Sequence, residues 1–364
     1  MLGACPALCH TLLKQLFLCG LLAFPCIALS APSHGVVVLM YHHFGESRFP
    51  STNVTLQQFD AHLHYLEQNQ FKIWPLEKVI KQLELAQPFP DRVVAITIDD
   101  AYRSIYTHAY PRLKKRHWPF TVFVSTDPID KKMPAFMSWA QMREMQQHGA
   151  TFANHTTHHD FLIKQSASET ERDWQLRVRN DLKMAQQRLQ TELGSAPALF
   201  AYPYGEYNSA LQQLIKELGW SAFGQQSGVI SQYSDRLALP RYPMAAQFAA
   251  LPSFKTKVMS LPLPVIDISP IDTVIKQQNP PPLQLTLAQD DDVQISQLNC
   301  FASNQGPAKV TWFDKEKGRF SVEANKPFNN RRSRYNCTAP SKSSARYYWY
   351  SHLWIRTTPT SALK

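Results

Sequence analysis

Two kinds of hydrophobic pattern alternate between residue 34 and about residue 260. Continuous apolar runs, typical of strands buried on both faces of a parallel sheet, occur at 35–42, 93–99, 120–126, 150–155 and 198–204. Stretches with helical spacing lie between them, at 56–69, 76–86, 102–116, 138–149 and 168–194. Repeated β–α units predict an α/β fold with a parallel sheet, and about 230 residues is near the usual size of a β/α barrel.

The pattern changes near residue 260, where proline becomes dense and helical spacing ends. We expect a barrel domain over 31–262, a Pro-rich linker over 263–282 and a small all-β sandwich over 283–364, where short alternating runs are separated by turns. The aromatic run 347–350 must place alternate side chains on opposite faces. Core packing is the favoured interpretation of these rings, and stacking on sugar is the alternative.

The first 30 residues have the features of a secretory signal peptide. They contain no acidic residue, and Lys14 precedes an apolar stretch that ends at small residues, with cleavage expected before Ala31. An uncleaved membrane anchor is the alternative, although the stretch is short for a span. We therefore expect an exported protein, periplasmic or extracellular, without a stable membrane span after cleavage.

Cysteine use agrees with export, because four of the six cysteines lie in the predicted leader. The remaining two, Cys300 and Cys337, suggest one disulfide in an oxidising compartment, and two buried thiols are the alternative.

The charge balance is basic, with 38 Lys and Arg against 28 Asp and Glu, a net charge of +10. This excess admits nucleic acid or an anionic polymer as a partner. No run of five basic residues occurs, so we expect no nucleic-acid partner. Arg331, Arg332 and Arg334 cluster near Cys337, where a solvated loop is favoured over contact with an anionic glycan.

Polar residues follow the ends of several predicted strands. Asp99 and Asp100 end one strand, His155 ends another with His159 four residues later, and Arg241 lies near the end of a later one. Active sites of β/α barrels lie at the carboxyl ends of the strands, so these side chains should converge. Two histidines and a carboxylate can bind a divalent metal, and a second carboxylate can accept a proton from water.

Asp99 and Asp100 are adjacent, and this limits how both can reach the same site. Adjacent residues on a strand point to opposite faces, so both can serve only if the strand has ended and the turn re-aims one of them.

Three segments resemble the first three motifs of the polysaccharide deacetylases of the NodB-homology type, carbohydrate esterase family 4. They are ITIDDAY at 96–102, NHTTHHDFL at 154–162 and FAYPYGEYN at 200–208. The resemblance covers roughly 35–260 and is greatest to the poly-β-1,6-N-acetylglucosamine de-N-acetylases of biofilm export systems. It implies a distorted seven-stranded β/α barrel.

The resemblance also implies roles for individual residues. Asp99 would be the general base, and Asp100, His155 and His159 would hold a divalent metal, most commonly Zn²⁺, with Co²⁺ or Ni²⁺ as alternatives. Tyr204 would offer its backbone N–H to the oxyanion.

Loop residues would support these groups, since Pro203 would shape the substrate-binding loop around Tyr204 and Thr156 would brace the metal-binding loop.

Two departures from the family pattern stand out. Ala201 occupies the position where many members have an arginine paired with the base, and Arg241 is the expected substitute. The late Leu-x-His motif that supplies the catalytic acid has no match. His158, His43 and a metal-bound water are the candidate acids.

These observations predict an enzyme that hydrolyses acetamide groups on an N-acetylhexosamine polysaccharide resembling poly-N-acetylglucosamine. A catalytically weak or inactive glycan-binding module is the alternative function, and peptidoglycan or chitin-like oligomers are the alternative substrates. Other envelope or biofilm-export proteins are candidate partners.

Overall fold

The computed structural model describes residues 34–357 and, before them, only Met1 and Gly3. The predicted signal peptide, residues 1–30, otherwise lies outside the described residues. Residues 34–357 belong to one compact unit. Within this described part, no helix is both long enough and apolar enough to cross a membrane.

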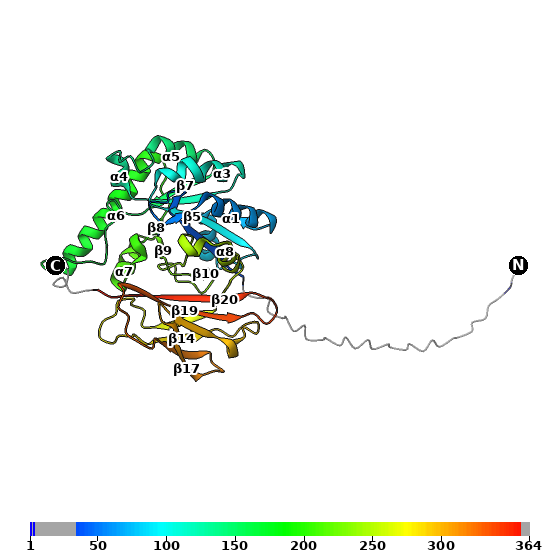
Figure 1. The fold of residues 1–364 in the computed structure, drawn as a ribbon. Coiled ribbons are helices and arrows are strands. Elements are labelled where there is room, and N and C mark those ends of the chain that lie inside the picture. The colour runs from blue at the N-terminus through cyan, green and yellow to red at the C-terminus, as the bar shows by residue number, and fades with distance from the viewer. Residues whose placement is uncertain (2, 4–33, 358–364) are drawn as a thin grey trace. The chain divides into compact units, whose positions relative to one another are not determined.

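A curled, largely parallel sheet forms the centre of the first part of the chain (Figure 1). Its main strands are β1 (Val36–Tyr41), β5 (Val93–Asp99), β6 (Phe120–Val124), β7 (Ala150–Asn154), β8 (Leu199–Ala201), β9 (Ser221–Phe223) and β10 (Val229–Ile230). Their order is β10-β1-β5-β6-β7-β8-β9, and β10 is antiparallel to β1. Two short strands, β4 (Lys72–Ile73) and β11 (Tyr242–Pro243), pair with β5 and β1.

One segment links the two margins of the sheet. Leu239 forms a parallel bridge to Phe223 of β9, and β11 pairs in parallel with Leu39 and Met40 of β1. Residues 239–243 therefore lie between β9 and β1, which curls the sheet toward a barrel. The expected α/β class with a distorted barrel is confirmed, and Arg241 sits in this linking segment.

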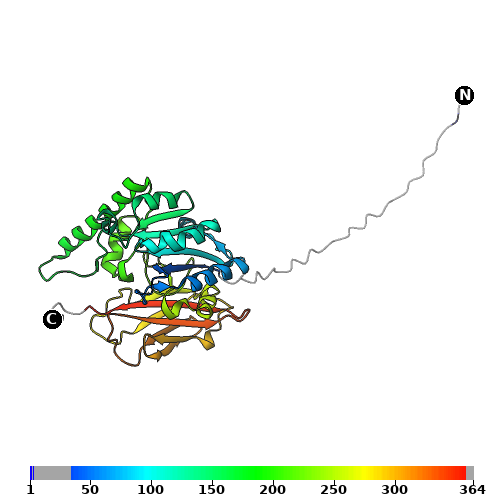
Figure 2. The ribbon, with the colours of Figure 1, turned by 45° about the horizontal axis from the view of Figure 1, so that its top comes forward.

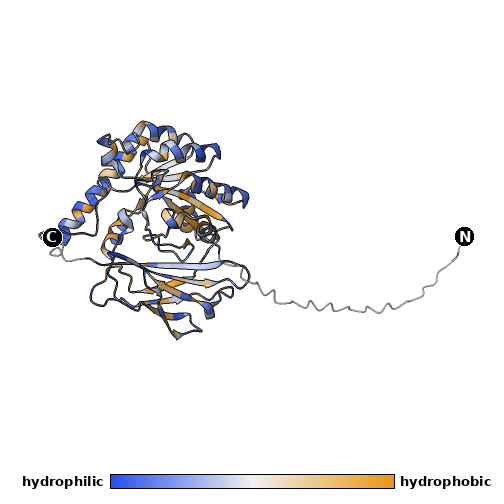
Figure 3. Ribbon diagram, viewed as in Figure 1, coloured by the Kyte–Doolittle hydropathy of each residue, from blue (hydrophilic) through white to orange (hydrophobic). Residues whose placement is uncertain are grey.

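Helices cover the sheet, with polar outer faces in Figure 3. They are α1 (Leu56–Gln68), α2 (Leu76–Glu84), α3 (Tyr110–Lys115), α4 (Thr126–Asp130), α5 (Trp139–Gln146), α6 (Glu171–Leu193), α7 (Ser209–Glu217) and α8 (Leu251–Val258). Single turns of 3₁₀-helix occur at Ala246–Ala249 and Ile295–Gln297, and Pro203–Gly205 forms a tight turn in which Tyr204 is non-helical.

Local sequence explains the ends of these helices. Thr55 begins α1 with a capping box to Gln58, which satisfies backbone N–H groups that a helix start leaves free. The predicted helix at 168–194 is observed as α6, capped by Thr170 and ended by Gly194 in the left-handed conformation. Before Pro111, the chain forms a π-helix at Ile105–Ala109 and then continues as α3. The missing proline N–H accounts for this irregular turn.

The C-terminal part contains two packed antiparallel layers, shown again in Figure 2. One sheet has the order β12 (Leu261–Pro262), β20 (Tyr347–Ile355), β19 (Arg332–Pro340), β15 (Asn299–Ala302) and β16 (Gly306–Pro307), with only the β12–β20 pair parallel. The other has β13 (Val265–Ser269), β14 (Leu283–Leu287), β18 (Arg319–Glu323) and β17 (Lys309–Asp314). Two further short strands, β2 (His43–Phe44) and β3 (Asn53–Val54), pair with each other near the barrel.

The sandwich core confirms the predicted disulfide. Cys300 of β15 and Cys337 of β19 lie directly opposite each other and are bonded. Phe320, Tyr335 and Tyr348 are buried in the same core.

The segment expected as a linker contributes to the sandwich. Within 263–282, β13 pairs antiparallel with β14, and the register is irregular between Val265 and Asp267. Trp349, in the aromatic run 347–350, faces the barrel. Its ring packs edge-on against Tyr242 with centroids 5.5 Å apart. The division into separate domains stays a prediction.

Candidate active site

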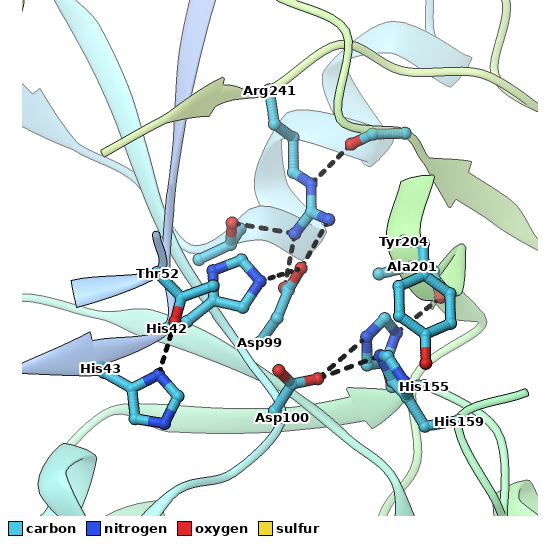
Figure 4. Close-up of polar contacts among 12 residues, drawn as sticks. His42, His43, Thr52, Asp99, Asp100, His155, His159, Ala201, Tyr204 and Arg241 are labelled. Atoms are coloured by element: carbon cyan, nitrogen blue, oxygen red, sulfur yellow. Dashed lines mark hydrogen bonds and ion pairs between the residues drawn. The ribbon is translucent and has the colours of Figure 1, made fainter. Parts of the chain in front are cut away.

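The end of β5 presents two carboxylates in one place (Figure 4). Asp99 is the last residue of the strand, and Asp100 follows it with a φ of 74°, in the left-handed region. Ala101 also has a positive φ, of 57°. The turn therefore re-aims Asp100, which meets the condition that the alternation of a strand imposes on two adjacent residues.

Asp99 forms a buried ion pair with Arg241. The two Nη atoms of Arg241 donate to Oδ1 and Oδ2 of Asp99 at 2.7 and 2.8 Å, and neither side chain is exposed. Arg241 Nε also donates to the carbonyl of Gly224 at 2.9 Å. Burial by itself would raise the pKa of Asp99, but the charges of Arg241, His155 and His42, together with the hydrogen bonds from Arg241, lower that pKa below its usual value. Asp99 is therefore ionised at neutral pH.

Asp100 meets two histidines at the same edge of the sheet. Its Oδ1 atom lies 3.3 Å from His155 Nε2 and 3.2 Å from His159 Nε2. Burial opposes ionisation of Asp100, yet its contacts with the histidines hold its pKa well below the usual range. The Asp100 carboxylate likewise raises the pKa of His159 against the lowering effect of burial.

Hydrogen bonds hold the ring of His155 and the backbone of His159 in place. His155 Nδ1 lies 2.7 Å from the carbonyl oxygen of Ala201, which can only accept, so Nδ1 carries the proton and Nε2 presents a lone pair. Thr156 Oγ1 accepts a bond from the backbone N–H of His159 at 2.8 Å. Asn154 Oδ1 accepts from the N–H of Thr156, also at 2.8 Å. Thr156 thus contacts the loop that carries His159.

These three side chains fit a divalent metal. One ligand atom each from Asp100, His155 and His159 lies within 4.8 Å of the others. Asp100 Oδ1 is buried and, within the described part of the chain, lacks a hydrogen-bond partner of good geometry. An anionic oxygen and two imidazole nitrogens are the donor types that zinc and similar ions select.

The loop after β8 closes another side of the site. Tyr204 has a φ of 58° within the turn Pro203–Gly205. Its ring stacks on Phe161 with centroids 3.9 Å apart and meets the His159 ring edge-on at 4.6 Å. Gly205 must be glycine, because its φ is 69° and an added Cβ would lie 2.6 Å from the side chain of Gln225. Pro203 is buried in the same turn.

Both candidate acid histidines point to other partners. His43 Nδ1 pairs with Thr52 Oγ1 at 3.0 Å, and its ring stacks on Tyr102. Burial lowers the pKa of His43 to about 4, so at neutral pH it is a neutral imidazole and not the imidazolium that a general acid requires. His158 Nδ1 lies 2.9 Å from Asp181 Oδ1 with its side chain about half exposed.

His42 also lies at this site, although none of the sequence motifs includes it. Its Nε2 lies 3.9 Å from Asp99 Oδ2, and its side chain is 13% exposed. The signal was present, because His42 is the first residue after β1 and so lies at the same strand edge as Asp100.

A family model for polysaccharide deacetylases matches residues 86–223, which include Asp99, Asp100, His155, His159 and Tyr204. The chain is 24% identical over 332 residues to the poly-β-1,6-N-acetyl-D-glucosamine N-deacetylase of Escherichia coli K12, covering 78% of this chain and 48% of that protein. This chain thus spans about half the length of that relative. It is 29% identical over 202 residues to the enzyme of the same name from Staphylococcus epidermidis, covering 54% and 70%.

The fold also matches a solved structure. The Streptococcus pyogenes deacetylase PplD, in complex with acetate, superposes with a TM-score of 0.55 and 25% identity. The match covers 62% of this chain and 98% of that one.

Proposed function

We propose that this protein removes acetyl groups from an N-acetylhexosamine polysaccharide, because residues 86–223 match the family model of the polysaccharide deacetylases. The reaction adds water across the acetamide C–N bond and yields acetate and a free amine. One observation carries the proposal. An ionised Asp99, held by Arg241, lies beside the Asp100, His155 and His159 cluster. Poly-N-acetylglucosamine is the favoured substrate, since it is named for the relatives from E. coli and S. epidermidis.

Asp99 is the proposed general base. Its lowered pKa keeps it ionised, and Arg241 fixes the direction of its oxygens, so it can accept a proton from the attacking water. Asp100, His155 and His159 are the proposed metal ligands. A divalent cation there supplies Lewis-acid polarisation of the acetyl carbonyl and acidifies water. Zn²⁺ suits the donor set best, and Co²⁺ and Ni²⁺ are the alternatives to be compared.

Tyr204 is proposed to stabilise the oxyanion. As the carbonyl carbon becomes tetrahedral, negative charge develops on its oxygen, and a preorganised backbone N–H there is worth about 3–4 kcal/mol. Pro203 and Gly205 shape the turn that presents this N–H and binds the acetyl end of the substrate.

His42 is the proposed acid for the leaving amine. It lies beside Asp99 and keeps some access to solvent, whereas His43 and His158 are held by Thr52 and Asp181. A proton on the nitrogen is needed because an amine anion is a poor leaving group.

The proposed cell compartment rests on the predicted signal peptide. A cleaved signal peptide over residues 1–30 would place the protein in the periplasm or outside the cell, which agrees with the Cys300–Cys337 disulfide. Envelope or biofilm-export proteins are the proposed partners there.

Acetate release from a panel of defined N-acetylated glycans tests the proposal. The panel should contain β-1,6-linked N-acetylglucosamine oligomers, chitin oligomers and peptidoglycan fragments, each with added Zn²⁺, Co²⁺ or Ni²⁺ and with chelator. We expect metal-dependent release, fastest from the β-1,6-linked oligomers. Glycan binding without acetate release under any metal would establish the binding-module alternative, and preference for another glycan would replace the proposed substrate.

A further inference from the structure

Arg331, just before β19, and Arg332, its first residue, contact the loop that carries Tyr204. Arg331 Nε and Nη2 donate to the two carboxylate oxygens of Glu206 at 2.8 and 2.7 Å. The Glu206 side chain is fully buried, and Arg331 is about one-third exposed. Glu206 lies two residues after Tyr204, so this bidentate pair joins the C-terminal sheet to the loop of the candidate active site.

The second arginine reaches Tyr204 itself. Arg332 Nη1 donates to the backbone carbonyl of Tyr204 at 2.9 Å, and its guanidinium lies 5.8 Å from the Tyr204 ring centroid. Arg331 also lies over the ring of Phe161 at 4.6 Å, and Phe161 stacks on Tyr204. The sheet therefore contacts Tyr204 through its carbonyl, through its ring neighbour and through Glu206.

Tyr204 needs this support because its backbone is unfavourable by itself. A non-glycine residue with a φ of 58° lies in the sparsely populated left-handed region. Such conformations persist only where the surroundings determine them, and relaxation here would turn the Tyr204 peptide plane. The backbone N–H of Tyr204, which is the proposed oxyanion donor, would then change its direction.

We propose that Arg331 and Arg332 are positioning residues for deacetylation. They hold the turn at Tyr204 in its strained conformation, so that the active site is incomplete without the C-terminal sheet. The solvated-loop interpretation of this basic cluster gives way to a specific contact with the barrel. The proposal rests on the deacetylase function for its catalytic consequence, but its structural core, restraint of the Tyr204 loop, can be measured without activity.

Arg346 offers a matched control elsewhere on the contact between the C-terminal sheets and the barrel. Its Nη1 donates to Asp91 Oδ1 at 2.8 Å, and its Nε donates to the carbonyl of Met259. It therefore also ties the sheet to the first part of the chain, but at the start of β5 instead of at its catalytic end.

Hydrogen–deuterium exchange of the full chain tests the restraint directly. We expect faster exchange over residues 202–208 in Arg331→Ala and in the double variant with Arg332→Ala, and unchanged exchange there in Arg346→Ala. Unchanged exchange in the double variant would overturn the proposal. An equal increase in exchange over residues 202–208 in Arg346→Ala would also overturn it. The loop would then loosen whenever the contact between the C-terminal sheets and the barrel is weakened at any point.

Kinetics test the catalytic consequence. Arg331→Ala should lower kcat about tenfold to a hundredfold, as misplaced oxyanion donors do, with KM nearly unchanged and full metal content. Arg331→Lys should recover only part of the loss, since lysine lacks the planar fork.

A double variant separates positioning from stability. Adding Glu206→Gln to Arg331→Ala removes the unpaired buried charge, so Tm should rise toward wild type while kcat stays low. Recovery of kcat together with Tm would show a purely structural role and overturn the proposal. If wild-type protein releases no acetate, the deacetylase function fails, and the exchange experiment still decides whether the arginines restrain the loop.

Discussion

Arg241 holds both carboxylate oxygens of Asp99, at 2.7 and 2.8 Å, with both side chains fully buried. The pair joins the end of β5 to the segment that links β9 and β1. Arg241 Nη1 also donates to Thr97 Oγ1 at 3.2 Å, so the guanidinium is fixed on several sides. The charge and direction of Asp99 are therefore set before substrate arrives.

Arg241→Ala should destabilise the protein and move its activity to higher pH. In the wild type the lowered pKa of Asp99 contributes stability above the unfolded-state value of about 4, and this contribution is lost as pH falls through the lower folded-state pKa. Without Arg241, burial dominates and raises that pKa. We expect the acid limb of kcat/KM to shift upward and unfolding free energy to fall by about 3–5 kcal/mol.

Denaturant unfolding and a pH profile of kcat/KM measure these effects. Arg236→Ala is the control, since Arg236 pairs with the exposed Glu84. This variant should leave the unfolding free energy and the pH profile nearly unchanged. An unshifted acid limb in Arg241→Ala would mean that Arg241 does not set the ionisation of Asp99.

Asp99→Asn should abolish acetate release while the protein keeps its metal. Asparagine has the same shape but cannot accept the proton from water, and loss of a general base costs at least about a hundredfold in rate. Acetate release and elemental analysis of freshly purified protein measure the two quantities. Release at the wild-type rate would remove Asp99 from the role of base.

Strand ends were the most informative feature of the sequence. Buried apolar runs locate the strands, and the barrel rule then places Asp99, Asp100 and His155 at one edge. Arg241 was expected because it lies near the end of a predicted strand and because Ala201 stands where many members of the similar family have the arginine that pairs with the base. The pairing of Cys300 with Cys337 was expected because they are the only two cysteines beyond the predicted leader.

Other features depend on tertiary structure that no local pattern encodes. The positive φ of Asp100 is set by the turn after β5. The sequence shows only that such a turn is required if Asp99 and Asp100 are to face the same site. His42 and His43 are adjacent, and their environments differ only once Thr52 and Tyr102 surround His43. The contact between Arg331 and Glu206 joins residues 125 positions apart and has no sequence signature.

His155→Ala should lose the metal. The Nε2 lone pair of His155 is directed at Asp100 by the bond from Nδ1 to Ala201, so alanine removes one proposed ligand and leaves two. Affinity should fall by more than the roughly 10–100-fold expected for loss of an outer partner. Elemental analysis and Zn²⁺ titration measure this, with His158→Ala as a control on the exposed neighbour that pairs with Asp181. Full metal content in His155→Ala would exclude it from the ligand set.

His42→Ala should separate amide from ester hydrolysis. If His42 protonates the leaving amine, its loss lowers acetamide hydrolysis by about 10²–10⁴-fold. An aryl acetate has a leaving group that departs without a proton, so its hydrolysis should change little. His43→Ala is the matched control, because His43 is held by Thr52 and is neutral near pH 7. Equal loss on both substrates in His42→Ala, with metal retained, would show that His42 supports Asp99 rather than the leaving group.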